Sequence, residues 1–455
     1  MLDLQKSEFL SRMILAIVLI TTLQGVSCSS GDPADREWIN ISPGIWKMET
    51  GPDTGLSLMT EAQAVPRMKD LSAFTETQFP LAESEIEIRL EAGRFCVRMP
   101  LETEEQLFGM GLNFKTVNQR GRILRLHMDH YGGRDNGRTH APVPFILSSR
   151  GYGVLVDTAR YIDVYAGTGV TRDSANPPKP RDRNTDPDWN PRPESDNLEI
   201  LVPGEHLRII LFAGDSMMDV LRRFNLFCGG GFIPPKWGLG FWQRTPTLYS
   251  SEEVKKEVED FASKGFPLDV IGLEPGWHSK SYPCTFSWDQ GRFPDPKGFI
   301  EEMAGMEIKV NLWMNPYLSP KSPLYRDMLP YSGTHTVWNG IVPDYSTPEA
   351  VKIMKDHLQK ELVGLGVSGF KTDEIDGFDY WLWPDTARFP SGKTGEEARQ
   401  TYCLNLLDLI DETYREEGLR TYGLTRAANA GAVRFPCVIY NDYYSHPDFI
   451  TALIN

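Results

Sequence analysis

The spacing of apolar residues changes near residue 235, and this change most constrains what the chain can fold into. From about residue 36 to residue 230, short runs alternate between apolar and polar residues and are separated by glycine, proline and aspartate. A period of two predicts β-strands with one buried face. We therefore expect an N-terminal β-sandwich domain over residues 36–230. After residue 235, apolar runs alternate with stretches of helical spacing, which indicates a second domain of another class.

The pattern of this second domain is typical of βα units around a parallel sheet. We expect its strands at Gly238–Trp242, Leu268–Leu273, Lys309–Met314, Val367–Thr372, Arg420–Leu424 and Cys437–Tyr440. Helical spacing fills Ser251–Ser263, Pro294–Met303, Pro348–Leu365 and Gly395–Glu417. No glycine-rich dinucleotide turn follows the first strand, which favours a (β/α)8 TIM-type barrel over a doubly wound sheet. About six βα units are present, so we expect a barrel over residues 235–455 that is incomplete at its C-terminus.

Residues 1–28 have the features of an export signal, possibly of the lipoprotein type. Basic residues precede an apolar run from Met13 to Leu23, and small residues follow up to Ser27. An uncleaved membrane helix is the alternative, but the run is shorter than the roughly 20 residues that a bilayer requires. Cys28 stands where a bacterial lipobox has its lipid-modified cysteine, although Gly25 replaces the usual leucine. We expect an exported protein that is periplasmic, extracellular or lipid-anchored at Cys28 in the cell envelope.

Charge and motif content exclude several classes of partner and cofactor. The 47 basic and 62 acidic side chains give a net charge of −15, which opposes binding to nucleic acid and to anionic membranes. The six cysteines include no CxxC pair, and the histidines lack a metal-binding framework such as HExxH. No phosphate-binding GxxxxGK[ST] loop is present. We therefore expect no metal and no cofactor, and a neutral or cationic small molecule as the partner.

Polar residues at the carboxyl ends of the predicted strands are the candidate functional residues, because a barrel of this kind presents them to its ligand. These residues are Glu274, Trp313, Asp373, Arg426 and Asp442. A solvated acidic loop would explain Asp373 and its acidic neighbours equally well. Two carboxylates across a barrel mouth are, however, what glycoside hydrolysis requires: one attacks the anomeric carbon or holds a water, and the other protonates the leaving oxygen.

Several ordered segments over roughly residues 100–455 carry motifs that can be compared with known families. In the sandwich these are QLFGMG at 106–111, QRG at 119–121 and PFILSSRGYGV at 144–154. In the barrel they are FPLDVIGLE at 266–274, FSWD at 286–289, RFPDP at 292–296, KTD at 371–373 and the stretch 426–442. Together these segments resemble glycoside hydrolase family 31, whose members are mostly retaining α-glycosidases. Full-length relatives continue beyond this point, so the resemblance implies a catalytic barrel that is truncated here.

The resemblance implies a role for each matching position. Asp373 matches the family's nucleophile, which would form a covalent glycosyl intermediate on the β face of the sugar. Asp442 matches the general acid/base, which usually follows a glycine, whereas Asn441 precedes it here. Arg426 and Arg434 match two arginines before the acid/base. The first usually contacts the sugar, and a structural role suits the second.

Further candidates for substrate contact surround the two carboxylates. They are Glu274, Trp277, His278, Trp313 and Lys371. Packing of the barrel mouth is the alternative for each tryptophan. Glu274 stands where α-glucosidases usually have an aspartate that binds the sugar's 4- and 6-hydroxyl side, and Glu374-Ile375-Asp376 replaces their Met-Asn-Glu run. These departures argue against plain α-glucosidase specificity.

The residues together predict a retaining α-glycosidase that acts by double displacement on the terminal α-linked sugar of an oligosaccharide or glycoside. The sugar stays open among α-galactoside, α-xyloside, α-glucoside and N-acetylgalactosaminide. Retention predicts about 5 to 5.5 Å between the Asp373 and Asp442 carboxyl groups, and inversion roughly 6.5 to 9.5 Å. Two alternatives are an inactive truncated or carbohydrate-binding remnant, and a transglycosylase of the same family.

Overall fold

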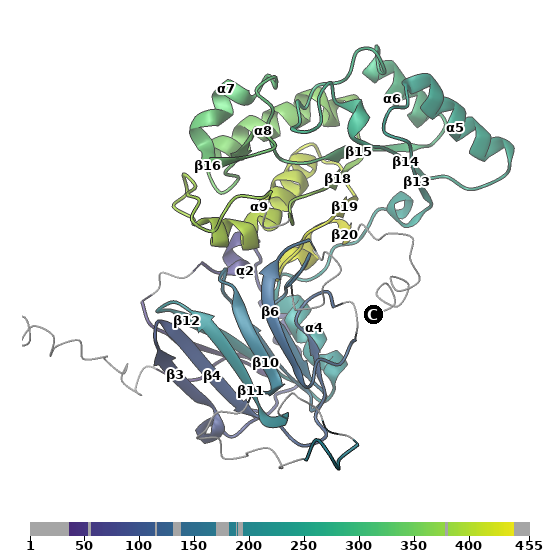
Figure 1. Ribbon diagram of the computed structural model, residues 1–455. Coiled ribbons are helices and arrows are strands. Elements are labelled where there is room, and N and C mark those ends of the chain that lie inside the picture. The colour runs from purple at the N-terminus through teal and green to yellow at the C-terminus, as the bar shows by residue number, and fades with distance from the viewer. Residues whose placement is uncertain are drawn as a thin grey trace, which may run out of the picture. The chain divides into compact units, whose positions relative to one another are not determined.

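The computed structural model describes residues 36–52, 56–113, 116–130, 138–169, 182–187, 189, 194–377 and 381–440 (Figure 1). The chain from Trp38 onward forms one compact unit. The predicted export signal with Cys28 lies outside the described residues, and so do Asn441 and Asp442. Within the ranges given above, none of the helices is both long and apolar enough to cross a lipid bilayer.

The N-terminal part is a β-sandwich of two six-stranded sheets, as the alternating pattern predicts. The first sheet has the order β1-β2-β12-β9-β8-β5, with strands Ile39–Ser42, Ile45–Thr50, Leu207–Ala213, Tyr152–Val156, Phe145–Ser148 and Leu107–Gly109. The second has the order β3-β4-β11-β10-β6-β7, with strands Glu87–Glu91, Arg94–Pro100, Glu194–Pro203, Ile162–Thr168, Arg122–Met128 and Arg138–Thr139. All pairings in both sheets are antiparallel except that of β6 with β7.

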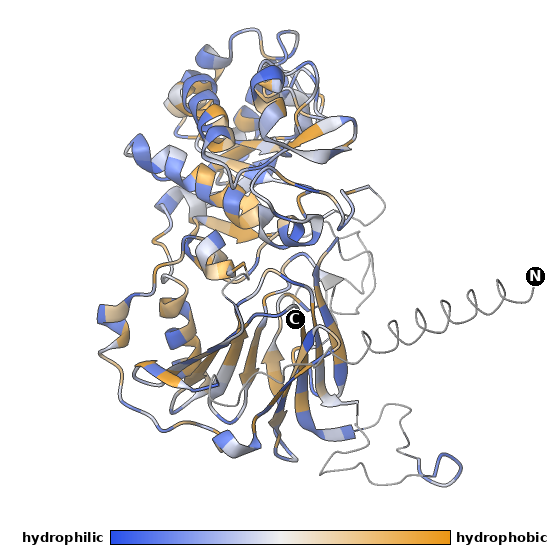
Figure 2. Cartoon of the chain, turned by 90° about the vertical axis from the view of Figure 1, so that its left-hand side faces the viewer, coloured by the Kyte–Doolittle hydropathy of each residue, from blue (hydrophilic) through white to orange (hydrophobic). Residues whose placement is uncertain are grey.

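Alternation along each strand explains the core of the sandwich. In β4, Phe95, Val97 and Met99 are buried in the core between the sheets, while Arg94 at the strand's start is exposed. Figure 2 shows hydrophobic and hydrophilic residues alternating along the strands. Strand β12 is buried on both faces, because Leu207 and Ile209 face the sandwich core while Ile210 and Phe212 join a second core. That second core extends into the C-terminal part of the chain.

The C-terminal part is built on six parallel strands in the order β13-β14-β15-β18-β19-β20. Their bounds are Trp242–Arg244, Val270–Leu273, Lys309–Met314, Gly369–Thr372, Gly423–Thr425 and Cys437–Ile439. Four of them overlap the predicted strands closely, and β19 shares only Gly423 and Leu424 with the predicted Arg420–Leu424. The prediction of Gly238–Trp242 is wrong, because residues Lys236–Leu239 form the 3-10 turn η3 and the strand begins only at Trp242. The apolar Leu239 and Phe241 are exposed rather than buried in the sheet.

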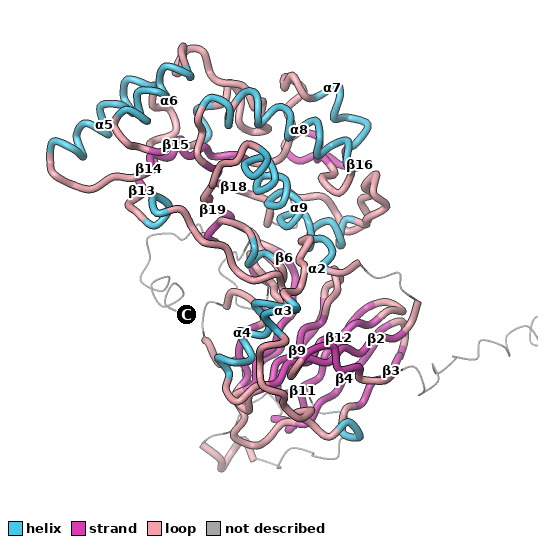
Figure 3. The backbone as a smooth tube through the Cα atoms, turned by 180° about the vertical axis from the view of Figure 1, so that it is seen from behind, coloured by secondary structure: helices cyan, strands magenta, loops and turns pink. Residues whose placement is uncertain are grey.

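Four long helices connect these strands and lie beside the parallel sheet (Figure 3). They are α5 (Ser251–Ser263), α6 (Pro296–Gly305), α8 (Pro348–Glu361) and α9 (Gly395–Glu416). Helices α5 and α9 each begin at a capping box, in which Ser250 or Thr394 exchanges hydrogen bonds with a glutamate three residues later. Between β19 and β20 the connection contains only the 3-10 turn η7 (Ala432–Arg434). The described residues therefore confirm the parallel sheet but not a count of complete βα units.

Shorter elements fill the loops of both parts. Near the sandwich these are α2 (Leu58–Glu61), α3 (Met68–Leu71), the 3-10 turn η2 (Glu83–Glu85) and α4 (Met217–Phe227). In the long connection after β15 lie α7 (Tyr325–Met328), η5 (Leu329–Tyr331) and the hairpin of β16 (Ser332–Val337) with β17 (Gly340–Pro343). The turns η4 (Pro275–Trp277) and η6 (Val363–Leu365) follow β14 and α8. The hairpin was not expected from the sequence.

One hydrophobic core joins the two parts. It runs from Phe145 and Phe212 of the sandwich, through Phe227 of α4, to Leu312 and Phe370 of the parallel sheet. The buried Lys393 adds a polar tie between them. Its ammonium group pairs with Glu61 of α2 and donates hydrogen bonds to Thr401 and Asn405 of α9 at 3.2 Å. The Glu61 side chain is itself largely covered, so the ion pair lies in the junction between the two parts.

Replacement of this lysine tests the polar tie. We expect Lys393→Met to lower the free energy of unfolding by about 3 kcal/mol, because it leaves the largely covered Glu61 carboxyl group without its cation. Lys352→Met removes the partner of Asp356 at 2.7 Å, but Lys352 is 73% exposed, so we expect a change below about 0.5 kcal/mol. The midpoints of urea unfolding measure both variants. Equal midpoints for the two would contradict this account of the junction.

Candidate active site

The carboxyl ends of the parallel strands bring most of the predicted residues to one edge of the sheet. The register pairs Leu273 with Leu312, Met314 with Thr372, and Thr372 with Thr425. Glu274, Asp373 and Arg426 each follow directly after the end of a strand. Parallel strands end on the same side, so these three side chains converge on one edge, together with Trp313 and Lys371.

Asp373 is held in one orientation by donors from three directions. The residue is 4% exposed, and its backbone N–H donates to the Met314 carbonyl at 2.8 Å. Trp313 Nε1 donates to Oδ2 at 2.7 Å. Oδ1 accepts from the Glu374 backbone N–H at 2.9 Å and lies 2.9 Å from Arg426 Nη1. Such converging donors stabilise a carboxylate whose charge is fixed in place.

Arg426 bridges two buried carboxylates. Its Nε donates to Asp376 Oδ1 at 2.8 Å, while Nη1 faces Asp373. The other oxygen of Asp376 contacts Nδ1 of His140, which comes from the sandwich. Burial opposes the charged form of Asp376, but Arg426 and His140 outweigh it and hold its pKa below the usual range. The N-terminal part therefore supplies one group of the charge network around Asp373.

A second ion-pair cluster lies beside the first. Glu274 pairs with Arg244 at the end of β13, and both of its oxygens lie 3.3 Å from Lys371 Nζ. Arg244 also donates to Asn311 Oδ1 at 2.8 Å and to the Leu273 carbonyl at 2.9 Å. Lys371 Nζ is 3.8 Å from Asp373 Oδ2, so this lysine links the two clusters. The cation also lies 5.0 Å from the centre of the Tyr440 ring.

Trp277 and His278 lie beneath Trp313 rather than next to Asp373. Both are 1% exposed. The Trp277 indole donates to the Trp313 carbonyl at 2.7 Å. The His278 ring stacks on the Trp277 indole, with 3.7 Å between the ring centres. His278 Nδ1 accepts from the Phe286 N–H at 3.2 Å, and burial lowers the pKa of His278 to about 3, so its ring is neutral. In the described structure these two residues support the site from below.

The sequence did not single out three residues of the site. Arg244 was missed because the first strand was predicted too early in the sequence. A strand predicted to end at Arg244 would have made this residue a candidate, as for the other strand ends. Asn311 lies inside a strand whose pattern is otherwise apolar. His140 is 236 residues from Asp376 in sequence, and no local pattern connects them. Arg434, for which the resemblance implied a structural role, contacts Asp408 at 2.7 Å.

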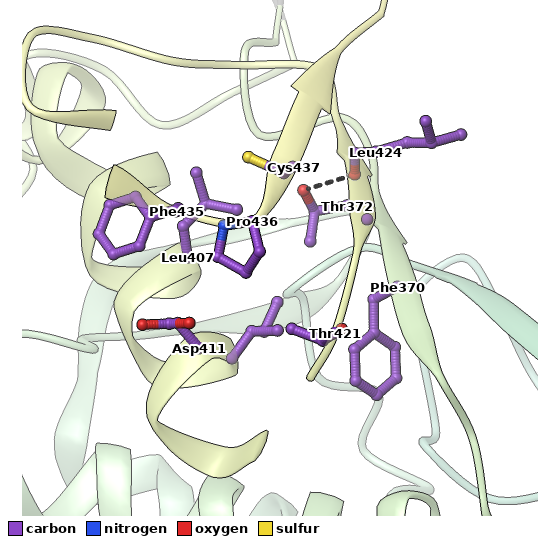
Figure 4. Close-up of a pocket in the computed structure, with 11 residues that line it drawn as sticks. Phe370, Thr372, Leu407, Asp411, Thr421, Leu424, Phe435, Pro436 and Cys437 are labelled. Carbon is purple, nitrogen blue, oxygen red and sulfur yellow. Dashed lines mark hydrogen bonds between the residues drawn. The ribbon is translucent and has the colours of Figure 1, made fainter. Parts of the chain in front are cut away.

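A small pocket lies apart from this edge, between α9 and strands β18 to β20 (Figure 4). Its volume of about 20 Å³ has room for one water molecule. Its lining is mostly apolar, with Phe370, Leu407 and Pro436 among the residues drawn. Among the described residues, none of the predicted site residues lines it. In the part of the chain that the structure describes, no group of three or more potential ligands could hold a metal ion.

Two profiles of a single family match the chain. "Glycosyl hydrolases family 31 TIM-barrel domain" matches residues 231–452, and "Glycosyl hydrolase 31 N-terminal galactose mutarotase-like domain" matches residues 64–164. These ranges fall on the parallel α/β part and on the sandwich. The chain therefore belongs to glycoside hydrolase family 31, which confirms the resemblance found in the sequence.

Relatives and solved structures agree with this membership. The chain is 27% identical over 335 residues to the α-xylosidase XylQ of Lactiplantibacillus pentosus, covering 70% of this chain and 40% of the relative. It is 25% identical over 360 residues to an α-xylosidase of Emericella nidulans, covering 76% and 42%. The chain thus spans less than half the length of these curated relatives. The Flavobacterium johnsoniae family 31 dextranase complexed with glucose shares the fold, with a TM-score of 0.70 at 20% identity over 89% of this chain and 53% of that one.

Asp376→Asn tests the charge network through the pH dependence of stability. A carboxyl group whose pKa is lowered on folding stabilises the protein above its unfolded-state pKa of about 3.9, and the contribution is lost as the pH falls below that value. We expect a lower melting temperature for the variant at pH 7 and a shrinking difference from wild type below about pH 4. The exposed Asp356→Asn is the matched control. A difference that stays constant from pH 7 to pH 3 would show that Asp376 is not charged in the fold.

Proposed function

We propose that the protein is a retaining α-glycosidase with Asp373 as its nucleophile. The observation that carries the proposal is the fixed carboxylate at the end of β18. Asp373 accepts hydrogen bonds from Trp313 and the Glu374 backbone and faces the Arg426 guanidinium. A nucleophile held in one orientation before substrate arrives lowers the entropic part of the barrier. The family resemblance assigns the nucleophile to the same residue, Asp373.

The proposed reaction is a double displacement. An oxygen of Asp373 forms a bond to the anomeric carbon as the bond to the leaving oxygen breaks, and Asp442 donates its proton to that oxygen. Water then attacks the anomeric carbon, gives a proton to Asp442 and releases Asp373, so the α configuration is retained. Tyr440 N donates to the Thr425 carbonyl at 2.9 Å, beside the site. Asp442 follows two residues after Tyr440 in the sequence and lies outside the described residues.

The sugar proposed for the first test is an α-xyloside. Two relatives that align with most of this chain are named α-xylosidases. Glu274, which stands where α-glucosidases bind the sugar's 4- and 6-hydroxyl side, is engaged by Arg244 and Lys371. α-Galactosides, α-glucosides and N-acetylgalactosaminides stay in the panel. Export, with or without a lipid anchor at Cys28, is also proposed, in keeping with a substrate outside the cell.

Release of nitrophenol from p-nitrophenyl α-glycosides of these four sugars tests the activity. We expect turnover of at least one member and a loss of about a thousandfold or more in Asp373→Ala and in Asp442→Ala, because each removes a group that acts on the reacting bond. Asp356→Ala, on the exposed side of α8, is the control and should keep full activity. A folded sample without activity on any member would favour a carbohydrate-binding remnant.

The configuration of the first product tests the mechanism independently of the rate. Proton NMR during hydrolysis should show the α anomer first, followed by slow mutarotation. Appearance of the β anomer first would contradict retention and would favour a wider separation of Asp373 and Asp442. Transfer of the sugar to a second sugar in place of water would identify a transglycosylase.

A further inference from the structure

Glu374, the residue after the proposed nucleophile, carries a buried oxygen without a partner. Its φ of 59° places it in the left-handed region, which turns the side chain away from the strand direction. Oε1 accepts from the Tyr282 hydroxyl at 3.2 Å, while Oε2 is buried and, among the described residues, has no hydrogen-bond partner. The Tyr317 hydroxyl donates to the backbone carbonyl of Glu374 at 2.7 Å and fixes the turn. A buried acceptor of this kind indicates a missing donor.

Tyr282, which contacts this carboxyl group, is the first of three aromatic residues from different loops that contact one another in a chain. Tyr282 follows β14, Trp338 comes from the β16–β17 hairpin, and Trp381 follows β18. The ring centres of Tyr282 and Trp338 are 5.0 Å apart, and Trp338 stacks on Trp381 at 4.7 Å. Tyr282 is 51% exposed, and both tryptophans are half-buried. Tyr282 also lies 5.4 Å from Trp313, which contacts Asp373. We call Tyr282, Trp338 and Trp381 the aromatic rim.

The backbone at Trp338 indicates that its position serves more than the fold. Val337 pairs with Gly340, so Trp338 and Asn339 are the two central residues of the hairpin turn. Their φ values of 48° and 63° correspond to a type I′ turn, which prefers asparagine followed by glycine. A tryptophan in this region is a genuine outlier. Strained residues of this kind gather at ligand sites, where the surrounding structure maintains them.

We propose that Glu374 and the aromatic rim form a second sugar subsite beside Asp373, where a pyranose ring stacks on Trp338 or Trp381 and donates a hydroxyl hydrogen bond to Glu374 Oε2. This rests on the proposed function and specifies the kind of substrate, an α-linked disaccharide or longer oligosaccharide. Aromatic rings together with a few placed polar groups are what a sugar-sized ligand requires.

The Glu374 carboxyl group suits a sugar hydroxyl group as its hydrogen-bond partner. Burial, reinforced by the neighbouring Asp373, raises the pKa of Glu374 to about 7. The group therefore exists in both charge states near neutral pH. A hydroxyl can donate to the carboxylate or accept from the carboxylic acid, whereas an ammonium group requires the carboxylate. The other ionisable groups that act on Glu374 are Arg426, Tyr282 and Asp376.

Disaccharide binding in the Asp373→Ala background tests this subsite without relying on turnover. The probes are isoprimeverose (α-xylosyl-1,6-glucose) and melibiose (α-galactosyl-1,6-glucose), each compared with free xylose or galactose by isothermal titration calorimetry. We expect Glu374→Ala and Trp338→Asn each to weaken the better-bound disaccharide about tenfold and to leave the binding of its monosaccharide unchanged. Asn339→Gly, in the same turn, is the matched control and should bind as its parent does.

Thermal melting separates loss of a ring from loss of the fold. Because asparagine suits a type I′ turn, Trp338→Asn should melt at or above the temperature of its parent while it binds the disaccharide more weakly. Equal disaccharide affinity in the parent and in both variants would overturn the proposal, whether or not the enzyme turns over nitrophenyl glycosides. Equal loss of mono- and disaccharide binding, or no binding of either disaccharide by the parent, would also overturn it.

Discussion

The site depends on one buried guanidinium group. Arg426 lies between Asp373 and Asp376 and is 3% exposed. Two carboxylates this close would repel each other in the interior, and burying either one alone would be costly. Arg426 and the His140 ring supply the compensating contacts, and the carboxylates in turn raise the pKa of the arginine further. This network gives the buried Asp373, the proposed nucleophile, its polar partners.

This constraint also explains why the sandwich belongs to the site. His140 follows β7, and its backbone carbonyl accepts from the Ala428 N–H at 3.1 Å, two residues after Arg426. The contact between His140 and Asp376 therefore links the sandwich to the C-terminal part. The continuous hydrophobic core and the Lys393–Glu61 pair hold the same two parts together elsewhere. A parallel sheet without the sandwich would leave Asp376 with one partner fewer.

The period of the sequence predicted the sandwich, the parallel strands and the four long helices, because burial of one face imposes that period. It also predicted Asp373, Arg426, Glu274 and Lys371 as neighbours, since parallel strands end on one side. It did not predict the β16–β17 hairpin, His140 or Arg244. Contacts between residues far apart in sequence leave no local pattern, and Trp338 occupies a turn position that turn preferences assign to asparagine. The acid/base at Asp442 stays a prediction that rests on the family resemblance.

Covalent trapping tests the central claim most directly. A 5-fluoroglycosyl fluoride of the sugar that proves to be a substrate should accumulate as a glycosyl–enzyme ester. The fluorine at C5 slows both displacements, but the fluoride leaving group keeps the first fast enough for the ester to form. Peptide mass spectrometry should then place the added sugar on Asp373. The same label on Glu374 or Asp376, or turnover of substrate without any trapped ester, would contradict the assignment of Asp373 as the nucleophile.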